Sequence, residues 1–157
     1  SKMSGQQKII DCLNFLLADE LMSRDQYFIH SEMYRNWGYT RLYERIKGEM
    51  GDEVEHARDF IVRILMLGGK PVVVPSPLNV CHDIKSMLEA DLQIELTVRH
   101  NIKKAIVLAE EEHDYVTRRI LVKQLRDTEE DHAYWLEQQL RLLENMGLEN
   151  YIQHVSR

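Results

Sequence analysis

Four long stretches of the chain carry apolar side chains every three or four residues, and no proline interrupts any of them. This periodicity is that of amphipathic helices. The predicted helices span about 6–36, 40–67, 84–113 and 115–146. All three prolines lie within residues 70–82, and proline breaks helix interiors. The chain is therefore predicted to be all-α, with a short additional helix in the tail at 148–155.

The connections between these helices decide how they are arranged. Gly38 and the pair Gly68–Gly69 signal the ends of the first two helices, and Asp83 and Asp114 can cap the starts of the last two. Short loops join antiparallel neighbours, whereas the long segment before Asp83 must return along the bundle. The second and third helices then run parallel, which gives a four-helix bundle with one long crossover. Gly147 separates the fourth helix from the tail.

Length and composition fit a single domain over residues 1–157, in which 44% of the residues are hydrophobic. Ser1 and Lys2 stand ahead of Met3 and are interpreted as an artificial leader that takes no part in the fold. The net charge of −6 comes without a basic stripe, which argues against nucleic-acid binding. No apolar run reaches the ~18 residues that a membrane span needs.

The two cysteines, Cys12 and Cys81, belong to no CxxC motif. The zinc-knuckle, rubredoxin-like and thioredoxin-like sites that such motifs encode are therefore not expected. Because the cysteines look unpaired and no signal-peptide pattern is found, we predict a location in the reducing cytoplasm.

One glutamate interrupts the apolar stripe of each predicted helix. The four are Glu20, Glu53, Glu95 and Glu129. Two of them are followed three residues later by a histidine, His56 or His132, and residues i and i+3 share a helix face. A buried carboxylate is costly unless it is paired, protonated or bound to metal. One such break would be ordinary, but four, with two Glu-x-x-His pairs on alternate helices, predict a shared metal site.

The spacing predicts a two-fold arrangement of these ligands, because the interval from single Glu to Glu-x-x-His is 33 residues in one half and 34 in the other. Carboxylate and imidazole ligands without thiolate suit iron or manganese, with zinc still possible. Four-helix di-iron carboxylate proteins use this ligand set. We assign Glu53 and Glu129 as bridging ligands and Glu20 and Glu95 as terminal ones. Two ions could each give one electron to O2 or peroxide.

Aromatic and histidine residues near this pattern have two interpretations. Tyr27 lies two turns beyond Glu20, so it could take part in the site, by hydrogen-bonding a ligand carboxylate or supplying an electron, or it could serve only as a core aromatic. Trp135 is interpreted as a core residue. The remaining histidines have no matching ligand pattern, so we expect solvated or capping roles for them, including for His30 and for His113 in a second Glu-x-x-His pair.

Ordered stretches along essentially the whole chain resemble the bacterioferritin family. The matching stretches are Asp19–Leu21, Gln26–His30, Asn36–Gly38, Asp52–Glu53, His56–Ala57, Ala90–Leu92 with Glu95, His113–Val116, Glu129, His132, Trp135–Glu137 and Gly147–Tyr151. The resemblance implies the ferritin-like form of the four-helix bundle and a hollow shell of 24 subunits.

The resemblance also implies an iron-storing ferroxidase. Its centre would lie within each subunit, and its metal ligands would be Glu20, Glu53, His56, Glu95, Glu129 and His132. Fe(II) would be oxidised by O2 or H2O2 and stored as ferric mineral. The iron would be released by reduction through a small ferredoxin.

Two positions depart from the family pattern. Haem-binding members carry a methionine directly after the glutamate of the second helix, where this chain has Val54. Haem b bound by that methionine is therefore not expected, and the chain resembles the haem-free, bacterial-ferritin-type members. The shell would be a homo-oligomer or a heteropolymer with a haem-binding subunit. Gly48 stands where many members have a histidine facing the cavity, so an inner-surface iron site built with Asp52 is in doubt.

Three alternative functions compete with iron storage. A di-metal oxygenase or peroxidase would share the ligands, although the rubrerythrin version lacks its CxxC pairs here. A structural zinc site would make the chain a binding or assembly subunit. An electron-transfer haem protein is disfavoured by Val54. The sequence leaves open whether the oxidant is O2 or peroxide, whether the di-iron site is a stable cofactor or a transit site, and which pores carry iron.

Overall fold

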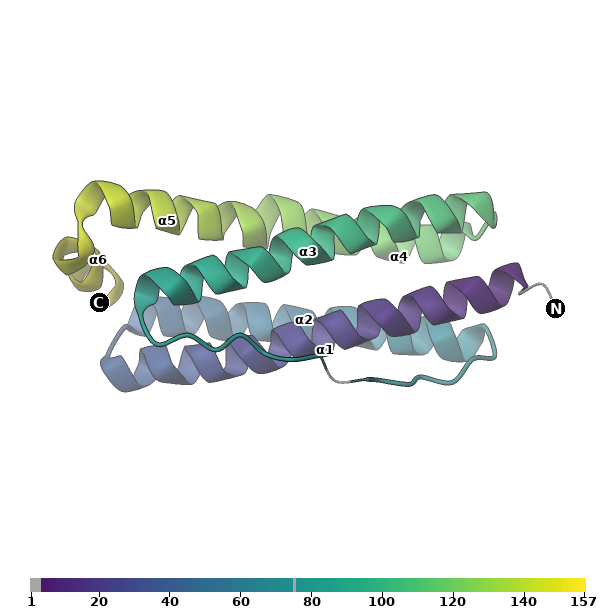
Figure 1. Cartoon of the computed structure of the whole chain (residues 1–157), viewed down its shortest axis with the longest axis horizontal. Coiled ribbons are helices and arrows are strands. Elements are labelled where there is room, and N and C mark those ends of the chain that lie inside the picture. Colours follow the sequence, from purple (N-terminus) through teal and green to yellow (C-terminus); the bar gives the residue numbers. More distant parts are fainter. Residues whose placement is uncertain (1–3, 75) are drawn as a thin grey trace.

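Helices make up most of the chain in the computed structural model, which describes residues 4–74 and 76–157; the interpretation of Ser1 and Lys2 lies outside these ranges. The helical elements are α1 (Gly5–Trp37), α2 (Thr40–Met66), α3 (Ile84–Glu111), α4 (Tyr115–Arg126), the π-helical segment η1 (Asp127–Ala133), α5 (Tyr134–Met146) and α6 (Leu148–Val155). The first three and the continuous run α4–η1–α5 form a four-helix bundle (Figure 1). The predicted all-α class with a short C-terminal helix is confirmed.

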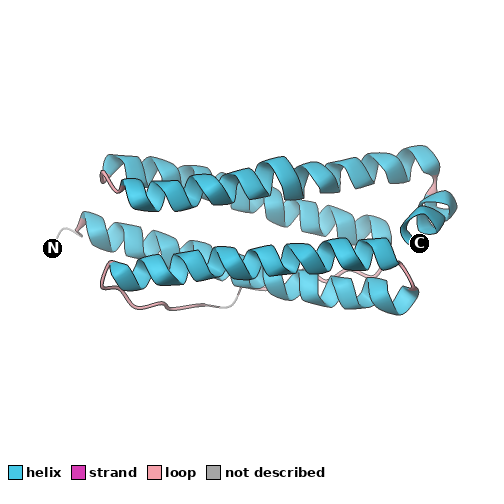
Figure 2. Ribbon diagram, turned by 180° about the vertical axis from the view of Figure 1, so that it is seen from behind, coloured by secondary structure: helices cyan, strands magenta, loops and turns pink. Residues whose placement is uncertain are grey.

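The order of the helices in the bundle follows the predicted crossover topology. In Figure 1, α1 and α2 are antiparallel neighbours, and the connection (described over 67–74 and 76–83) then runs the length of the bundle before α3 begins. As a result α2 and α3 run in the same direction, while the last helix returns beside α3. Seen from behind, the connection lies along one side and α6 lies across one end of the bundle (Figure 2). None of the helices in the described ranges is long and apolar enough to cross a membrane.

Local chemistry fixes the helix ends where the sequence predicts them. The Asp83 side chain accepts a hydrogen bond of 3.0 Å from the backbone N–H of Ser86, and the Asp114 side chain accepts one of 3.0 Å from Thr117. These bonds satisfy N–H groups that the first turn leaves without helical partners. At the C-terminus of α1, Gly38 has a φ of 83°, which a residue with a side chain rarely adopts.

A buried polar group ties the long connection to α1 and α3. The Asp91 carboxylate lies 2.9 Å from His30 Nδ1 and accepts a hydrogen bond of 2.9 Å from Gln26. His30 Nε2 in turn accepts from the backbone N–H of Cys81, and Gln26 accepts from that of Asn79. His30 is fully buried, so the predicted solvated role is wrong. Its partner lies in a loop far away in the sequence, and helical spacing says nothing about that contact.

Two apolar clusters fill the bundle on either side of a polar layer. One contains Leu17, Phe60 and Ile102, and the other contains Ile46 and Leu88. Each of the five is 0% exposed. Burial of each such side chain contributes about 2 kcal/mol. The two clusters therefore stabilise the fold, and the buried acids and histidines lie between them.

The fourth helix of the bundle is not regular, contrary to prediction. The sequence predicts one uninterrupted helix over 115–146, but η1 inserts a π-helical stretch, in which each turn holds more residues than an α-helical turn. Before η1 the buried positions are Leu121 and Thr128, whereas counting back in sevens from Leu136 predicts Val122 and Glu129. The core-facing stripe is thus displaced by one residue over this part of the helix.

Candidate metal centre

Five of the six predicted ligands meet in the polar layer. They are Glu20 on α1, Glu53 and His56 on α2, Glu95 on α3 and His132 on η1. Each is at most 4% exposed. Their burial means that the carboxylates must be neutralised by protons, by the histidines or by bound cations.

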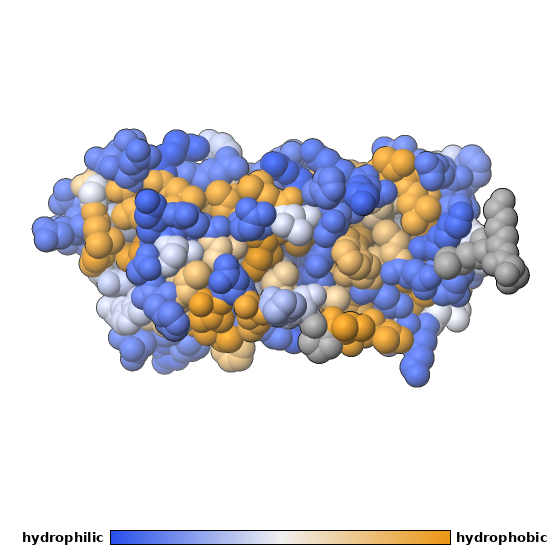
Figure 3. Space-filling view, in the orientation of Figure 1, coloured by the Kyte–Doolittle hydropathy of each residue, from blue (hydrophilic) through white to orange (hydrophobic). Residues whose placement is uncertain are grey.

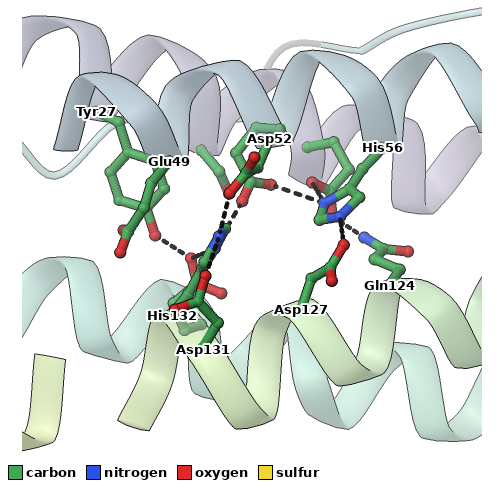
Figure 4. Close-up of polar contacts among 12 residues, drawn as sticks. Tyr27, Glu49, Asp52, His56, Gln124, Asp127, Asp131 and His132 are labelled. Atoms are coloured by element: carbon green, nitrogen blue, oxygen red, sulfur yellow. Dashed lines mark hydrogen bonds and ion pairs between the residues drawn. The ribbon is translucent and has the colours of Figure 1, made fainter. Parts of the chain in front are cut away.

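The first group of ligand atoms comes from α1 and α2. His56 Nδ1 lies 3.4 Å from Glu20 Oε2 and 3.7 Å from Glu53 Oε2. One ligand atom from each of the three residues lies within 4.8 Å of the others. On its other side, His56 Nε2 lies 2.7 Å from Asp127 Oδ2 (Figure 4).

The second group forms around His132. Its Nδ1 lies 3.2 Å from Glu53 Oε1 and 3.3 Å from Glu95 Oε1. Its Nε2 lies 2.9 Å from Asp52 Oδ2 at the surface of the bundle (Figure 4). Glu53 therefore presents one oxygen toward each histidine and lies between the two groups.

Both histidines are oriented in the same way by an outer carboxylate. Asp127 holds Nε2 of His56 and Asp52 holds Nε2 of His132, so Nδ1 of each ring is directed at the buried glutamates. Metal-binding histidines are commonly fixed by such a partner at the second ring nitrogen. This arrangement leaves the Nδ1 atoms available to bind a cation.

Glu129 is the one predicted ligand that does not join the cluster in this structure, and its assignment as a ligand stays a prediction. Its side chain is 43% exposed, and its Oε1 lies 3.7 Å from Arg99 Nη1 and 3.7 Å from Lys103 Nζ. The cause is η1, which places Thr128 at the buried position that regular α-helical spacing would give to Glu129. The carboxylate is turned to the outer surface.

Two buried residues near the cluster were not predicted. Glu49, on α2, is 2% exposed and has a ligand atom within 4.8 Å of those of Glu95 and His132. Gln124, on α4, donates a hydrogen bond to Glu20. Glu49 precedes Glu53 by four residues and so lies on the same helix face, a signal that seven-residue steps alone do not detect.

The buried charges interact strongly. Burial, together with the nearby Glu53, raises the pKa of Glu20 well above its usual range. Burial also raises the pKa of Glu49 to about 8. Burial alone would lower the pKa of His56, but the nearby carboxylates of Glu20 and Glu53 outweigh it and raise that pKa to about 11. Protons therefore compensate the carboxylates when no cation is bound.

Several atoms in the cluster that could bind a metal have no hydrogen-bond partner. They include Glu20 Oε2, Glu49 Oε2 and His56 Nδ1, all of them buried. Such atoms are destabilising unless something fills the space between them. Carboxylate oxygens and imidazole nitrogens are ligands for iron, manganese or zinc, so the donor set fits a divalent transition-metal ion.

Tyr27 is linked to this cluster, as one of its two interpretations predicts. It is fully buried, and its hydroxyl donates a hydrogen bond to Glu95 Oε1. Burial raises the pKa of Tyr27 well above its usual range, which keeps the phenol protonated. Trp135 is only partly buried, and the Arg45 guanidinium lies 4.8 Å from the centre of its ring.

The two departures from the family pattern both lie on α2. A Cβ at Gly48 would meet no atom within 4 Å, and the nearby Asp52 side chain is 51% exposed. Val54 is partly buried. The expectations about an inner-surface iron site and about haem both stay predictions.

Comparison with known proteins gives a consistent result. Residues 10–146 match the ferritin-like domain family. A bacterial ferritin of Neisseria meningitidis serogroup B is 58% identical, over 96% of this chain and 98% of that protein. A bacterial ferritin of Pseudomonas aeruginosa is 53% identical over the same shares, and a bacterioferritin of Mycolicibacterium paratuberculosis is 40% identical over 99% and 98%.

Proposed function

This chain belongs to the ferritin family, and from that premise we propose that it stores iron and oxidises Fe(II) at the buried centre. The observation that carries the proposal is the position of Glu53, with one carboxylate oxygen toward His56 and the other toward His132. A carboxylate placed between two imidazoles can bridge two ions. Glu20 would complete the first ion's ligands and Glu95 the second's.

The proposed reaction needs two neighbouring ions. Two Fe(II) substrate ions lose one electron each. Either O2 takes both electrons with two protons and leaves as H2O2, or H2O2 takes them with two protons and gives two water molecules. Holding both ions on one bridging carboxylate allows a two-electron reduction without release of a radical.

The protein's own groups hold the ligands in place. Asp127 and Asp52 accept the Nε2 protons of His56 and His132, so each Nδ1 can bind a cation that displaces its proton. The apolar clusters on both sides limit the access of water to the buried glutamates. Tyr27 positions Glu95 through its hydroxyl and is the nearest candidate for an electron donor.

We further propose that subunits associate into a 24-subunit shell that encloses ferric mineral. Large apolar side chains on α1 are exposed, including Phe15 at 60% and Phe28 at 53%. Figure 3 shows several apolar patches on the face that α1 and α3 form. Apolar surface of this kind is typical of protein interfaces. Partnership with a haem-binding subunit, iron release by a small ferredoxin and a cytoplasmic location stay predictions.

A rapid-mixing experiment tests the ferroxidase proposal. Fe(II) is added aerobically to the apo-protein at two ions per subunit, and absorbance and O2 uptake are recorded. We expect a fast phase that saturates near two irons and disappears in Glu53→Ala. The matched control is Glu55→Gln, a 64% exposed glutamate two residues away on the same helix, which should behave as wild type. Oxidation no faster than in buffer would refute the proposal and favour a structural metal site.

A second experiment tests storage. The assembled protein is loaded with several hundred Fe(II) per particle and analysed by sedimentation. We expect a particle of 24 subunits of 18.6 kDa that stays soluble as its iron content grows. Precipitation of iron outside the protein, or a particle too small to enclose a mineral, would contradict the storage proposal.

A further inference from the structure

We propose that Glu49 is a metal ligand that holds the second ion together with Glu95 and His132, in the place that the sequence pattern gives to Glu129. This inference rests on the proposed two-ion centre and deepens it, because it changes which carboxylate completes that centre.

Glu49 is in the right place for this role. It lies on α2 one turn before Glu53, so both side chains leave the same face of the helix. Ligand atoms of Glu49, Glu95 and His132 lie within 4.8 Å of one another, and all three residues are buried. In Figure 4, Glu49 extends from α2 into the space that the Tyr27 hydroxyl and His132 also enter.

The two oxygens of Glu49 have different surroundings. Oε1 accepts a hydrogen bond of 3.1 Å from Arg45 Nε. Oε2 is fully buried and has no hydrogen-bond partner. Leaving a carboxylate oxygen in this state is unfavourable. One oxygen is thus anchored by Arg45 while the other is free to bind a cation, which is how outer partners orient the carboxylate ligands of metals.

The charge balance of a centre with two divalent ions also favours a fourth carboxylate. Glu20, Glu53 and Glu95 bring three negative charges, whereas two divalent ions bring four positive ones. Glu49 supplies a fourth carboxylate inside the bundle, with Arg45 paired to its other oxygen. Glu129 cannot do so in this conformation, because its carboxylate lies on the outer surface between Arg99 and Lys103.

Anaerobic titration of the assembled apo-protein with Co(II), followed by calorimetry and visible absorption, tests this assignment. Wild type should bind two Co(II) per subunit. In Glu49→Gln, which keeps the shape and an acceptor for Arg45, the second Co(II) should bind at least about tenfold more weakly and the first should be unchanged. The matched variant Glu129→Gln should bind both as wild type does. Circular dichroism checks folding; if Glu49→Gln fails to fold, Glu49→Ala replaces it, with the same expected loss of affinity for the second Co(II) only.

The outcomes separate this inference from the ferroxidase proposal. Retention of both Co(II) affinities in Glu49→Gln, or loss of the second ion in Glu129→Gln, would overturn the role of Glu49. If wild type binds two Co(II) and Glu49→Gln loses one, but Fe(II) is not oxidised, the ligand assignment holds and the ferroxidase proposal fails. If wild type binds no Co(II), both fail.

Discussion

The half of the centre built on α1 and α2 and the half built on α3 and the last helix contain the same residue types at nearly the same spacing, yet they are organised differently. In the first half, Glu20, Glu53 and His56 lie on regular α-helices and come together as predicted. In the second, η1 contains both Glu129 and His132 but directs Glu129 outward, and the buried carboxylate grouped with Glu95 and His132 is Glu49, which belongs to α2.

This difference shows what a repeated spacing can and cannot predict. A Glu-x-x-His pair shares a face only while the helix keeps about 3.6 residues per turn. Asp127 lies five residues before His132, and the π-helical turn brings it to His56 on the opposite helix. Asp127, from the last helix, thus contacts His56 in the first half, whereas Glu129 points away from the second half. The two halves therefore share residues and are not independent copies.

The largest expected effects come from removing each histidine separately. We expect His56→Ala to weaken Co(II) binding at one position, and His132→Ala at the other, by about 100-fold or more, because loss of even an outer partner typically costs 10–100-fold. Calorimetric titration of each variant measures this. Loss of both ions in either variant would show that the two positions bind Co(II) only together, and it would contradict the division of the centre into two halves.

The stability of the apo-protein should depend on pH through the buried groups of both halves. The pKa of Glu49 is raised from 4.5 to about 8, so its contribution is complete below pH 4.5 and is lost as pH rises through 8. The pKa of His56 is raised from 6.5 to about 11, so its contribution is lost between those values. Thermal unfolding of the apo-protein should therefore show falling stability above pH 5.

The variant Glu49→Gln sharpens this test. It should make the decline between pH 5 and 8 shallower and leave the decline at higher pH, to which His56 contributes. Divalent cations replace the protons, so Co(II) should oppose the decline in wild type. A wild-type apo-protein that becomes more stable between pH 5 and 8 would contradict the description of these buried groups.

Deleting Thr128 should make the second half resemble the first. Without the extra residue, the turn before His132 can be α-helical, and Glu129 takes the buried position of Thr128. In this background Glu49→Gln should no longer weaken the second Co(II), so an effect of about tenfold should disappear. Titration of the single and double variants measures the change. A persistent effect of Glu49→Gln would mean that η1 is not what excludes Glu129.

The smallest expected effects come from the outer carboxylates. Asp127→Asn should weaken the ion beside His56, and Asp52→Asn the ion beside His132, each by about tenfold, because an amide orients the imidazole less strongly. Each change should affect only its own position. If Asp127→Asn weakens the ion beside His132 instead, the assignment of Asp127 to the first half is wrong.

Much of the fold could be predicted because it depends on local pattern. Helix periodicity, the caps at Asp83 and Asp114, and the long connection together determine the topology. The displaced register could not be predicted, because Leu121 and Val122 are both apolar and either can continue the stripe. The burial of His30 depends on a loop contact distant in sequence. In both cases the packing of segments distant in the sequence selects one local arrangement among several that the sequence pattern does not distinguish.

The most direct test of the two-ion centre is the anomalous diffraction of a crystal soaked anaerobically with Fe(II). The structure predicts two iron peaks inside each subunit, one beside Glu20 and His56 and one beside Glu49, Glu95 and His132, with Glu53 in contact with both. Absence of iron from the buried layer would contradict the proposed centre. A second peak bound by Glu129, with Glu49 still held only by Arg45, would contradict the assignment of its ligands.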